Sequence, residues 1–575
     1  MHKQHPRGHP GGRARALHET NHQRLTVIIA TAALLIGIGL LHTPLVHAQD
    51  DNPGTVAELI EAIETANSQP GNDATITLTA PQYVLTKTYD ATADSGLPVI
   101  STTVTIEGNG AIIRRTSDDH FRLFYVFPEG ELTLRNVTVT GGGSDISPRA
   151  GGGILNYGRL TIEGSTISEN EVQATDAVGG GGIANYAGTL TIRNGHVTSN
   201  TLESSVQVAV GGGVLNRHDG TVIIEDTSIA HNTAKGGGGA LGGGLANESG
   251  SITIRHATVD HNETHRAFVL VAAGETRTDN GYGFSGGGLA NQGTLTMTES
   301  TVSKNSAEQD GGGVYNLPNG TLALWSSTLR ENVCNRDGGG VYNHASAPVQ
   351  VLNCTISGNG GQSGGGVANL GTITVAHTTI STNTASQRGG GFFESSADTA
   401  TFQHTIIAGN EASEGAEVAL ASEASANANS YNLFGHAGLS DTVAFSGFSP
   451  GPNDIKATQD GANTSLSSIL DPALKDNRGK TWTHALVAGS PAIDAGNPDV
   501  ESPPPYDQRG VGFTRVSNGL IDIGAYEYQG SQAVGGATVS GTGRGIRVSA
   551  AVLLALAAAA GFSLMLASRP RPTSA

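Results

Sequence analysis

The stretch GGGVYNLPNGTLALWSSTLREN, residues 311–332, decides the fold because it recurs along the chain. Each copy begins with three glycines, carries two short apolar runs and closes on an asparagine. Successive copies lie 25 to 31 residues apart, except for one spacing of 44. A repeat of this length indicates a solenoid or another repeat array. The nine copies begin at Gly151, Gly180, Gly211, Gly242, Gly286, Gly311, Gly338, Gly364 and Gly389.

The apolar runs are rich in Val, Ile, Leu and Thr, and they alternate with polar residues, as in residues 160–162, LTI. This alternation is typical of strands, and no window shows the 3.6-residue period of a helix. One copy holds two or three strands, which is too few for a four-stranded propeller blade. The sequence therefore predicts an all-β parallel β-helix, in which every coil pairs with its neighbours about 4.8 Å away.

Two asparagine positions recur in phase with the glycines. Because Asn tolerates left-handed turns and its amide can bond to the amide of the next coil, we interpret both columns as structural ladders. The first column is Asn156, Asn185, Asn216, Asn247, Asn291, Asn316, Asn343 and Asn369, with Glu394 at the ninth place. The second column closes each copy and comprises Asn170, Asn200, Asn232, Asn262, Asn305, Asn332, Asn359, Asn383 and Asn410.

The pattern GGG-(I/V/L)-x-N followed by (T/S)-(I/V)-x-x-N resembles the short repeats of polymorphic outer-membrane and autotransporter-passenger proteins. The resemblance covers residues 151–410. It implies a right-handed parallel β-helix of the pectate-lyase-like kind on a bacterial cell surface. It implies little about activity, because this fold carries many functions.

Composition narrows the classes of function. Only 14% of the 575 residues are charged and 82 are glycine, which suits a stack of coils turned by small polar residues. The net charge of −18 argues against a nucleic-acid partner, whose phosphates require a basic face. Cys334 and Cys354 fall in neighbouring coils and leave a disulfide possible, whereas no Cys/His metal spacing is present.

The N-terminal region predicts export. A basic stretch, an apolar run over 25–41 and the small-x-small triplet ending at Ala48 are typical of a secretory signal peptide, residues 1–48, cleaved after Ala48. Residues 49–150 then hold one amphipathic helix and the early coils. Thr55 and Glu58 form a capping box at the start of that helix, which we expect to cover the first coil.

The longest insert between copies, Glu263–Ser285, is the predicted binding loop. Inserts that leave one corner of a solenoid often carry binding. The alternative is a flap whose apolar residues 267–273 pack on the flank of the coils. The residues proposed for recognition are Glu263, Arg266, Phe268, Arg277 and Tyr282.

Beyond Asn410 the period fails, and residues 411–530 are expected to hold closing coils and a further module. Residues 431–528 resemble the "choice-of-anchor" module that ends many bacterial surface β-helix proteins, through the motifs SPAIDAG (490–496), DQRG (507–510) and IDIGAYE (521–527). We interpret the charged residues of these motifs as holding the module together, with a calcium site as a secondary possibility. They are Asp494, Asp507, Arg509, Asp522 and Glu527.

The C-terminal residues predict attachment to a membrane. A Gly/Ser/Thr linker, 531–547, precedes the uncharged apolar segment 548–567, which is long enough for a transmembrane or sorting helix. Residues 568–575 would then form a cytoplasmic tail.

No motif predicts catalysis, a metal site or a cofactor. The carboxylates of the repeats are scattered, and only His231 and His261 share an equivalent position, beside Asp260. The hypothesis is a secreted, surface-anchored structural or adhesive protein that presents loops to an extracellular glycan or protein. The alternatives are a polysaccharide lyase or glycosidase of the β-helix class, which would need clustered acids, and an inert surface spacer.

Overall fold

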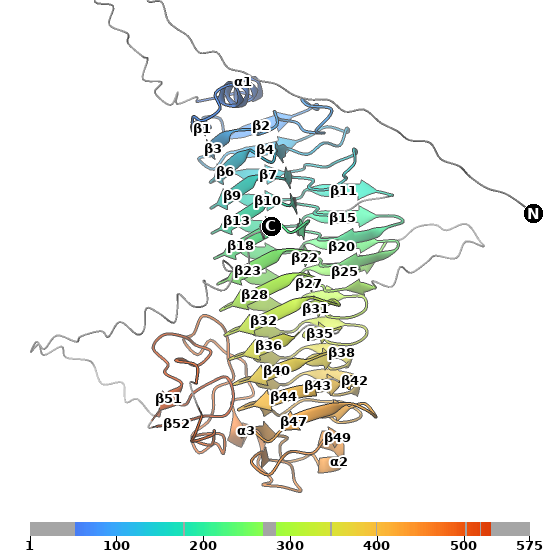
Figure 1. Ribbon diagram of the computed structural model, residues 1–575, viewed down its shortest axis with the longest axis vertical. Helices are drawn as coiled ribbons and strands as arrows, with labels where there is room; N and C mark the ends of the chain where they lie inside the picture. Colours follow the sequence, from blue (N-terminus) through green and yellow to red (C-terminus); the bar gives the residue numbers. More distant parts are fainter. Residues whose placement is uncertain are drawn as a thin grey trace, which may run out of the picture. The chain divides into compact units, whose positions relative to one another are not determined.

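The computed structural model describes residues 52–530, apart from 176–178, 268–282, 345–347, 398, 501–502 and 518. These residues form a parallel β-helix of right-handed type with about 12 coils, as Figure 1 shows. The predicted parallel β-helix and its repeats are confirmed. The predicted signal peptide, linker and cytoplasmic tail lie outside the described residues.

Three long sheets form the walls of the β-helix, and every strand pair within them is parallel. Sheet 1 has 13 strands, from β1 (Ala74–Thr77) to β47 (Ser425–Ala428). Sheet 2 has 14 strands, from β2 (Gln82–Leu85) to β50 (Ile455–Lys456). Sheet 3 has 12 strands, from β5 (Phe124–Val126) to β49 (Phe445–Ser446).

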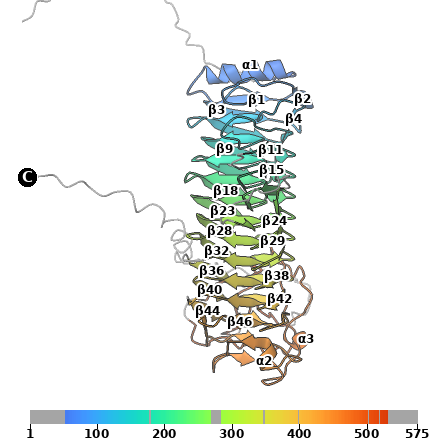
Figure 2. The ribbon, with the colours of Figure 1, turned by 90° about the vertical axis from the view of Figure 1, so that its right-hand side faces the viewer.

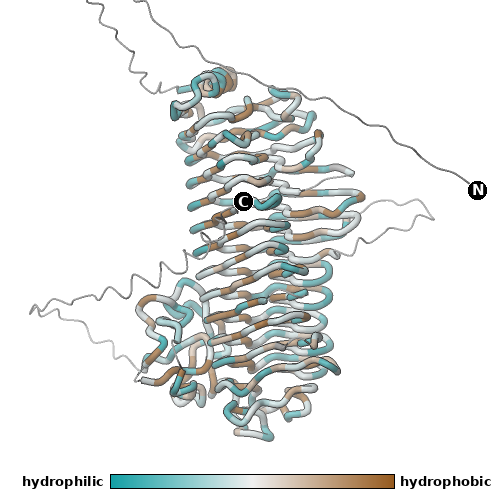
Figure 3. Tube along the Cα trace, viewed as in Figure 1, coloured by the Kyte–Doolittle hydropathy of each residue, from teal (hydrophilic) through white to brown (hydrophobic). Residues whose placement is uncertain are grey.

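The core lies inside the coils and is built from apolar side chains stacked in register. Ile192 of β13 (Thr189–Arg193) pairs with Ile162 in the preceding coil and Ile224 in the following one, and all three are fully buried. Hydrophobic residues therefore recur at equivalent places in successive coils (Figure 3). Burying one such side chain stabilises the fold by roughly 1.5–3 kcal/mol. A shift of one residue would turn this whole column outward, so the register is strongly specified.

Helix α1 (Val56–Asn67) lies across the first coil (Figure 2). Thr55 and Glu58 form the capping box that begins the helix. Two residues of the helix itself, Leu59 and Ile63, are fully buried. At its other end, the Asn67 amide donates to the carbonyl of Val99 at 2.6 Å. The helix thus covers apolar residues that would otherwise face solvent at the edge of the stack.

The opposite end of the core is filled by phenylalanines. Parallel stacking continues past Asn410 through β48 (Leu433–Phe434) and β49, where the repeat pattern is no longer visible in the sequence. Phe402, Phe434 and Phe448 meet edge to face, with ring centroids 5.0–6.3 Å apart. Such contacts add to the free energy gained from burial.

The inserts between the early copies build a structure that we call the edge fin. An eight-stranded parallel sheet runs along this edge, and its later strands are β30 (Ser306–Ala307), β34 (Val333–Cys334), β38 (Gly360–Ser363) and β42 (Thr384–Arg388). Its first four strands each begin an insert between early copies: β11 (Glu171–Ala174), β15 (Thr201–Ser204), β20 (Thr233–Gly236) and β25 (Glu263–Arg266). Three of them return in a second sheet formed by β16 (Val208–Val210), β21 (Gly239–Leu241) and β26 (Phe284–Ser285). A small apolar cluster joins the two sheets and comprises Val172, Leu202, Ala209, Ala234, Ala240 and Phe284.

Residues 457–530, which we call the closing module, run back along the outer face of sheet 2. They include α3 (Leu466–Ile469) and the only antiparallel pair among the named strands of the described chain, β51 (Val516–Ser517) with β52 (Leu520–Ile521). Figure 1 shows them beside the last coils. Their apolar residues surround Ile406, which points outward from β45 (Ile406–Ile407).

The transmembrane part of the predicted fold is not supported and is corrected here. Across the part of the chain that the structure describes, no helix is both long enough and apolar enough to cross a membrane. Helix α1 has 12 residues, whereas a membrane-spanning helix needs about 20. Segment 548–567 itself lies outside the described residues. The prediction that a C-terminal helix attaches the protein to a membrane is therefore not supported.

Candidate functional site

The predicted binding loop is rooted in the edge fin. Glu263 and Arg266 both lie in β25, whereas Phe268, Arg277 and Tyr282 fall outside the described residues. The Arg266 guanidinium lies 4.7 Å from the centre of the Phe284 ring, on the strand to which the insert returns. Its backbone N–H donates to Glu308 Oε2 at 2.6 Å. Both ends of the insert are thus fixed to ordered strands.

The asparagine columns form two continuous hydrogen-bonded ladders inside the coils. In the second column, each Nδ2 donates to the Oδ1 of the next coil at 2.9–3.0 Å, from Asn170 through to Asn410. The first column makes the same bond from Asn156 to Asn369. All these side chains are buried, so the bonds satisfy amides that water cannot reach.

Each ladder ends on a carboxylate. Asn369 Nδ2 donates to Glu394 Oε2 at 2.6 Å, and Asn410 Nδ2 donates to Glu417 Oε2 at 2.7 Å. All amides in a ladder point the same way, so the last one presents a donor that no further asparagine accepts. A buried carboxylate accepts this bond and faces the positive end of the aligned dipoles. Glu394 and Glu417 therefore close the ladders.

The left-handed turn lies one residue before the second column rather than on the asparagine itself. Glu169, Ser199, His231 and His261 occupy this position with φ between 51° and 57°. The rings of His231 and His261 stack 5.0 Å apart at this corner. His261 Nδ1 pairs with Asp260, a neighbour in sequence. Within the described chain, no group of three or more His, Cys, Asp or Glu side chains could hold a metal ion.

The carboxylates of the repeats are engaged in pairs between coils. On the outer face of sheet 1, one position alternates in sign over six coils: Glu107, Arg135, Glu163, Arg193, Glu225 and Arg255. Arg135 bridges the two flanking glutamates at 2.7 and 2.8 Å. Such exposed pairs contribute about 0–1 kcal/mol each, but they oppose a shifted register. The scattered acids thus act as cross-strand partners.

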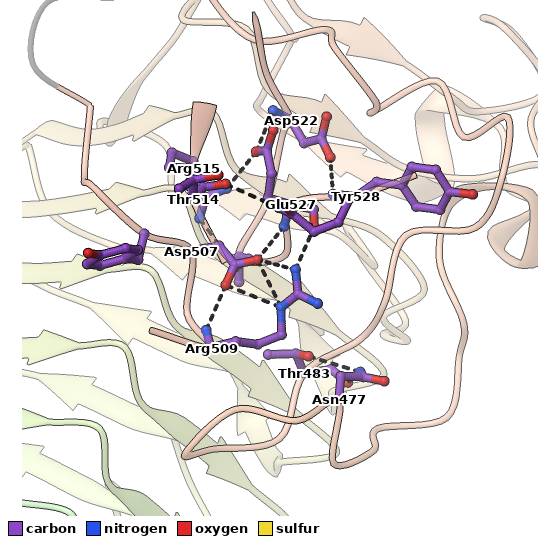
Figure 4. Close-up of polar contacts among 12 residues, drawn as sticks. Asn477, Thr483, Asp507, Arg509, Thr514, Arg515, Asp522, Glu527 and Tyr528 are labelled. Carbon is purple, nitrogen blue, oxygen red and sulfur yellow. Dashed lines mark hydrogen bonds and ion pairs between the residues drawn. The ribbon is translucent and has the colours of Figure 1, made fainter. Parts of the chain in front are cut away.

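The closing module contains a buried charge cluster, shown in Figure 4. Of the residues singled out in the sequence, it includes Asp507, Arg509, Asp522 and Glu527, whereas Asp494 is exposed. Arg509 Nη2 donates to Asp507 Oδ2 at 2.6 Å and Arg509 Nε to the same oxygen at 3.0 Å, with both side chains almost fully buried. The guanidinium lies between Phe513 and Tyr526, 3.9 and 3.7 Å from the ring centres. A planar cation is well suited to such a slot.

The other carboxylates of the cluster accept backbone hydrogen bonds. Asp522 accepts the N–H of Asp494 at 2.8 Å, and Glu527 accepts the N–H of Asp522 at 3.0 Å. Asp507 accepts the N–H of Glu527 at 2.8 Å. Asp507, Asp522 and Glu527 are therefore joined by one network (Figure 4), to which Asp494 contributes its backbone N–H.

Two residues that the sequence did not mark fasten the module to the coils. Arg515 is fully buried and donates to Asn353 Oδ1 of a coil corner at 2.7 Å. Gln508 donates to Thr328 Oγ1 at 2.9 Å and accepts from Thr355 Oγ1 at 2.5 Å. In the sequence, Gln508 stands between the charged residues of the DQRG motif, and Arg515 stands between that motif and IDIGAYE. Neither indicates a partner more than 150 residues away.

Burial changes the titration of the cluster. It raises the pKa of Glu527 to about 8 and that of Asp522 to about 6, while it lowers the pKa of Arg515. Arg509 and Arg515 lie among these carboxyls, and the proton that Glu527 retains limits the negative charge buried beside them. The cluster is closed off from solvent, and its groups bind one another. Its chemistry therefore suits a structural clamp.

Both cysteines are free and buried. Cys354 shares its column with hydroxyl side chains such as Ser327 and Thr378, and its sulfur lies 3.3 Å from the carbonyl oxygens of Leu324 and Leu352, to either of which the thiol can donate. Burial raises the pKa of both thiols to about 12, so they are protonated at neutral pH.

Comparison with protein-family models, curated proteins and solved structures finds no significant match for this chain. The resemblance to bacterial surface proteins therefore depends on the sequence motifs alone. What the molecule does must be argued from its own geometry.

Proposed function

We propose that the protein is a secreted, non-catalytic scaffold of the cell surface that presents binding loops on the edge fin to an extracellular glycan or protein. The observation that carries this proposal is the fin itself. Four consecutive inserts, which share no repeat with the coils, pair in register and so hold the ends of the longest insert on ordered strands.

A preformed root reduces the entropy lost when a loop binds a partner. The root is stabilised by its own apolar cluster and by the contact of Arg266 with Phe284. Binding residues are often found on loops that a rigid scaffold positions. Residues 268–282 lie between β25 and β26 in the sequence and contain the proposed recognition residues Phe268, Arg277 and Tyr282.

The motifs quoted above support the location. The signal-peptide pattern before residue 49 and the similarity to autotransporter-passenger repeats both favour secretion. The "choice-of-anchor" resemblance of residues 431–528 favours the cell surface. The buried charge cluster of that module supports a structural role, since its acids and cations are used within the protein.

Binding of the full-length chain to an array of glycans and extracellular proteins tests the proposal. We expect binding that is lost when residues 268–282 are replaced by a three-residue Gly-Ser-Gly turn. The matched control replaces residues 176–178, in a shorter insert on the same edge, and should bind like the original. Equal binding by both variants would show that residues 268–282 are not needed for binding. If the original protein binds nothing on the array, the inert spacer is favoured.

A further inference from the structure

Sheet 3 has a second apolar cluster on its outer face, separate from the core inside the coils. At the N-terminal end of this face, five aromatic side chains form what we call the aromatic row. Phe127 and Tyr125 belong to one coil, and Tyr157, Tyr186 and His218 belong to the next three. The same cluster includes Val210 and Leu241 of the fin strands β16 and β21, which precede strands of sheet 3, whereas the rings of the row lie toward the C-terminal ends of the sheet-3 strands.

The rings follow one another along the axis of the stack. Tyr125 and Tyr157 have ring centroids 5.6 Å apart, Tyr157 and Tyr186 are 5.5 Å apart, and Tyr186 and His218 are 5.2 Å apart. Phe127 extends the row at 6.4 Å from Tyr125 and is 44% exposed. The spacing follows the rise of the coils, so the row repeats once per coil along the molecule.

The row is held in place from behind. The buried Arg122 guanidinium lies 6.0 Å from the Tyr125 ring and donates to Ser144 Oγ at 2.7 Å. The Ser144 hydroxyl in turn donates to the buried Asp94 carboxylate at 2.8 Å. This buried network places a cation behind Tyr125, the ring that begins the row in its first coil, and ring packing connects Tyr125 to Tyr157. Fixed rings lose little entropy on binding.

Polar groups accompany the rings. The Tyr186 hydroxyl is buried without a hydrogen-bond partner among the residues that the structure describes. Burial raises the pKa of Tyr157 to about 12, so its hydroxyl remains a donor at neutral pH. Tyr186 is only 3% exposed and packs between its neighbours, so the surface open to a ligand consists of the half-exposed Tyr125 and Tyr157 with the exposed Phe127 and His218. These residues offer apolar ring surface and hydroxyl groups side by side, which a lipid surface would not require.

The charges beside the row are paired. Arg217 lies beside the Tyr186 ring and contacts Glu248 at 2.5 Å, and Arg159 lies 3.8 Å from Glu131. No surplus of cations is therefore available for an anionic polymer, and the net charge of −18 repels one. The ligand that complements this surface is elongated, uncharged, and both apolar and rich in hydroxyls.

We propose that the aromatic row binds a linear, neutral glycan chain that lies along the axis of the stack. Each sugar ring presents a C–H face that can pack on a tyrosine and hydroxyls that can bond to the tyrosine hydroxyls and to the Arg217–Glu248 pair. The row spans four coils, so affinity should rise with chain length from the disaccharide to the hexasaccharide.

The test is calorimetric titration of the full-length chain with cellohexaose, mannohexaose and maltohexaose, and with hexagalacturonate as the charged probe. At least one neutral hexasaccharide should bind, and the double variant Tyr125→Ala/Tyr157→Ala should weaken that binding by about tenfold or more. Tyr157→Phe keeps the ring and should lose less. Tyr89→Ala removes an aromatic side chain that is 42% exposed and lies outside the row, and should change nothing.

Four results would overturn the proposal. They are no binding of any neutral probe at about 1 mM, tighter binding of hexagalacturonate, unchanged binding by the double variant, and self-association of the protein that the double variant abolishes. Replacement of residues 268–282 should leave hexasaccharide binding intact, which separates this surface from the edge fin. Hydrogen exchange of the neighbouring strands shows whether the double variant keeps its fold.

Discussion

The outer face of sheet 2 differs between the two halves of the stack, although both halves use the same repeat. In an early coil, Thr166 and Ser168 of β10 (Thr166–Ser168) are half-exposed. At the equivalent places in a late coil, Thr355 and Ser357 of β37 (Thr355–Ser357) are buried. The closing module covers the late coils and leaves the early ones open. The repeat therefore specifies the coil, whereas residues 457–530 determine whether the outer face of sheet 2 is buried or exposed.

Covering the flank gives its hydroxyls new partners. Thr355 donates to Gln508 at 2.5 Å, Ser357 lies 2.8 Å from His484 Nε2, and Thr379 accepts the N–H of Ala525 at 3.1 Å. In the open half, the same positions need only water. The fold can thus convert a solvated face into an interface without changing its residues. The first four predictions below test that difference.

The largest effect is expected from Arg515→Ala. Arg515 is fully buried, bonds to Asn353 and lies 3.7 Å from the Glu527 carboxyl, so its loss removes both the fastening to the coil and one of the two cations of the cluster. Removing one partner of a buried charge network costs roughly 3–5 kcal/mol. Hydrogen exchange should rise in the closing module but not in the edge fin. The exposed Arg478→Ala is the control, and equal exchange in both variants would contradict the role of Arg515.

The ladders should matter equally in both halves, because they lie inside the coils. Asn232→Ala and Asn359→Ala each remove an acceptor used by the side chain and the backbone N–H of the preceding asparagine. Each loss should destabilise the surrounding coils by about 1–3 kcal/mol. Local exchange rates near each site measure the cost. A much smaller effect at one site would show that the ladder does not stabilise the two halves of the stack equally.

The flank itself should respond only where it is covered. Thr379→Val removes the acceptor for Ala525 and should cost about 1–2 kcal/mol in docking of the module. Thr166→Val alters the equivalent, half-exposed position and should change stability by no more than about 0.5 kcal/mol. The melting temperature of the closing module, followed by the fluorescence of Trp482, is compared between the two variants. Similar costs at both sites would mean that the covering is unimportant.

The last prediction is a change in pH dependence. Glu527 has an ordinary pKa of 4.5 but one of about 8 in the folded protein, so the folded state keeps a proton that the unfolded state releases. Stability from this group is therefore lost as pH rises from 4.5 towards 8. Glu527→Gln cannot ionise, so the variant should lose less stability over that range. Melting curves that stay parallel at every pH would exclude this titration.

The sequence predicted the β-helix because the coil is a local structure. Leu160, Ile162 and the glycine triplets recur at fixed spacing, and that period alone specifies strands, turns and stacking. It also marked Asp507 and Arg509, which lie two residues apart and form a buried pair. Motifs that close within a few residues can be recognised in this way.

What the sequence did not reveal depends on contacts between distant segments. Arg515 and Asn353 meet only after the chain returns along sheet 2, and no local motif marks that contact. The fin strands were hidden because their pairing depends on stacking rather than on composition. The membrane helix was expected from hydropathy at residues 548–567, and no helix of the described chain supports it.

Release of sugar from a polysaccharide panel, measured alongside binding to the same panel, tests the central claim most directly. The claim is that the protein binds at its exposed surfaces and that its buried acids serve structure. The full-length chain should bind without releasing reducing or unsaturated sugar, and Glu527→Gln should behave identically. Release of either product would contradict the claim and favour a catalytic role for the carboxylates of the coils.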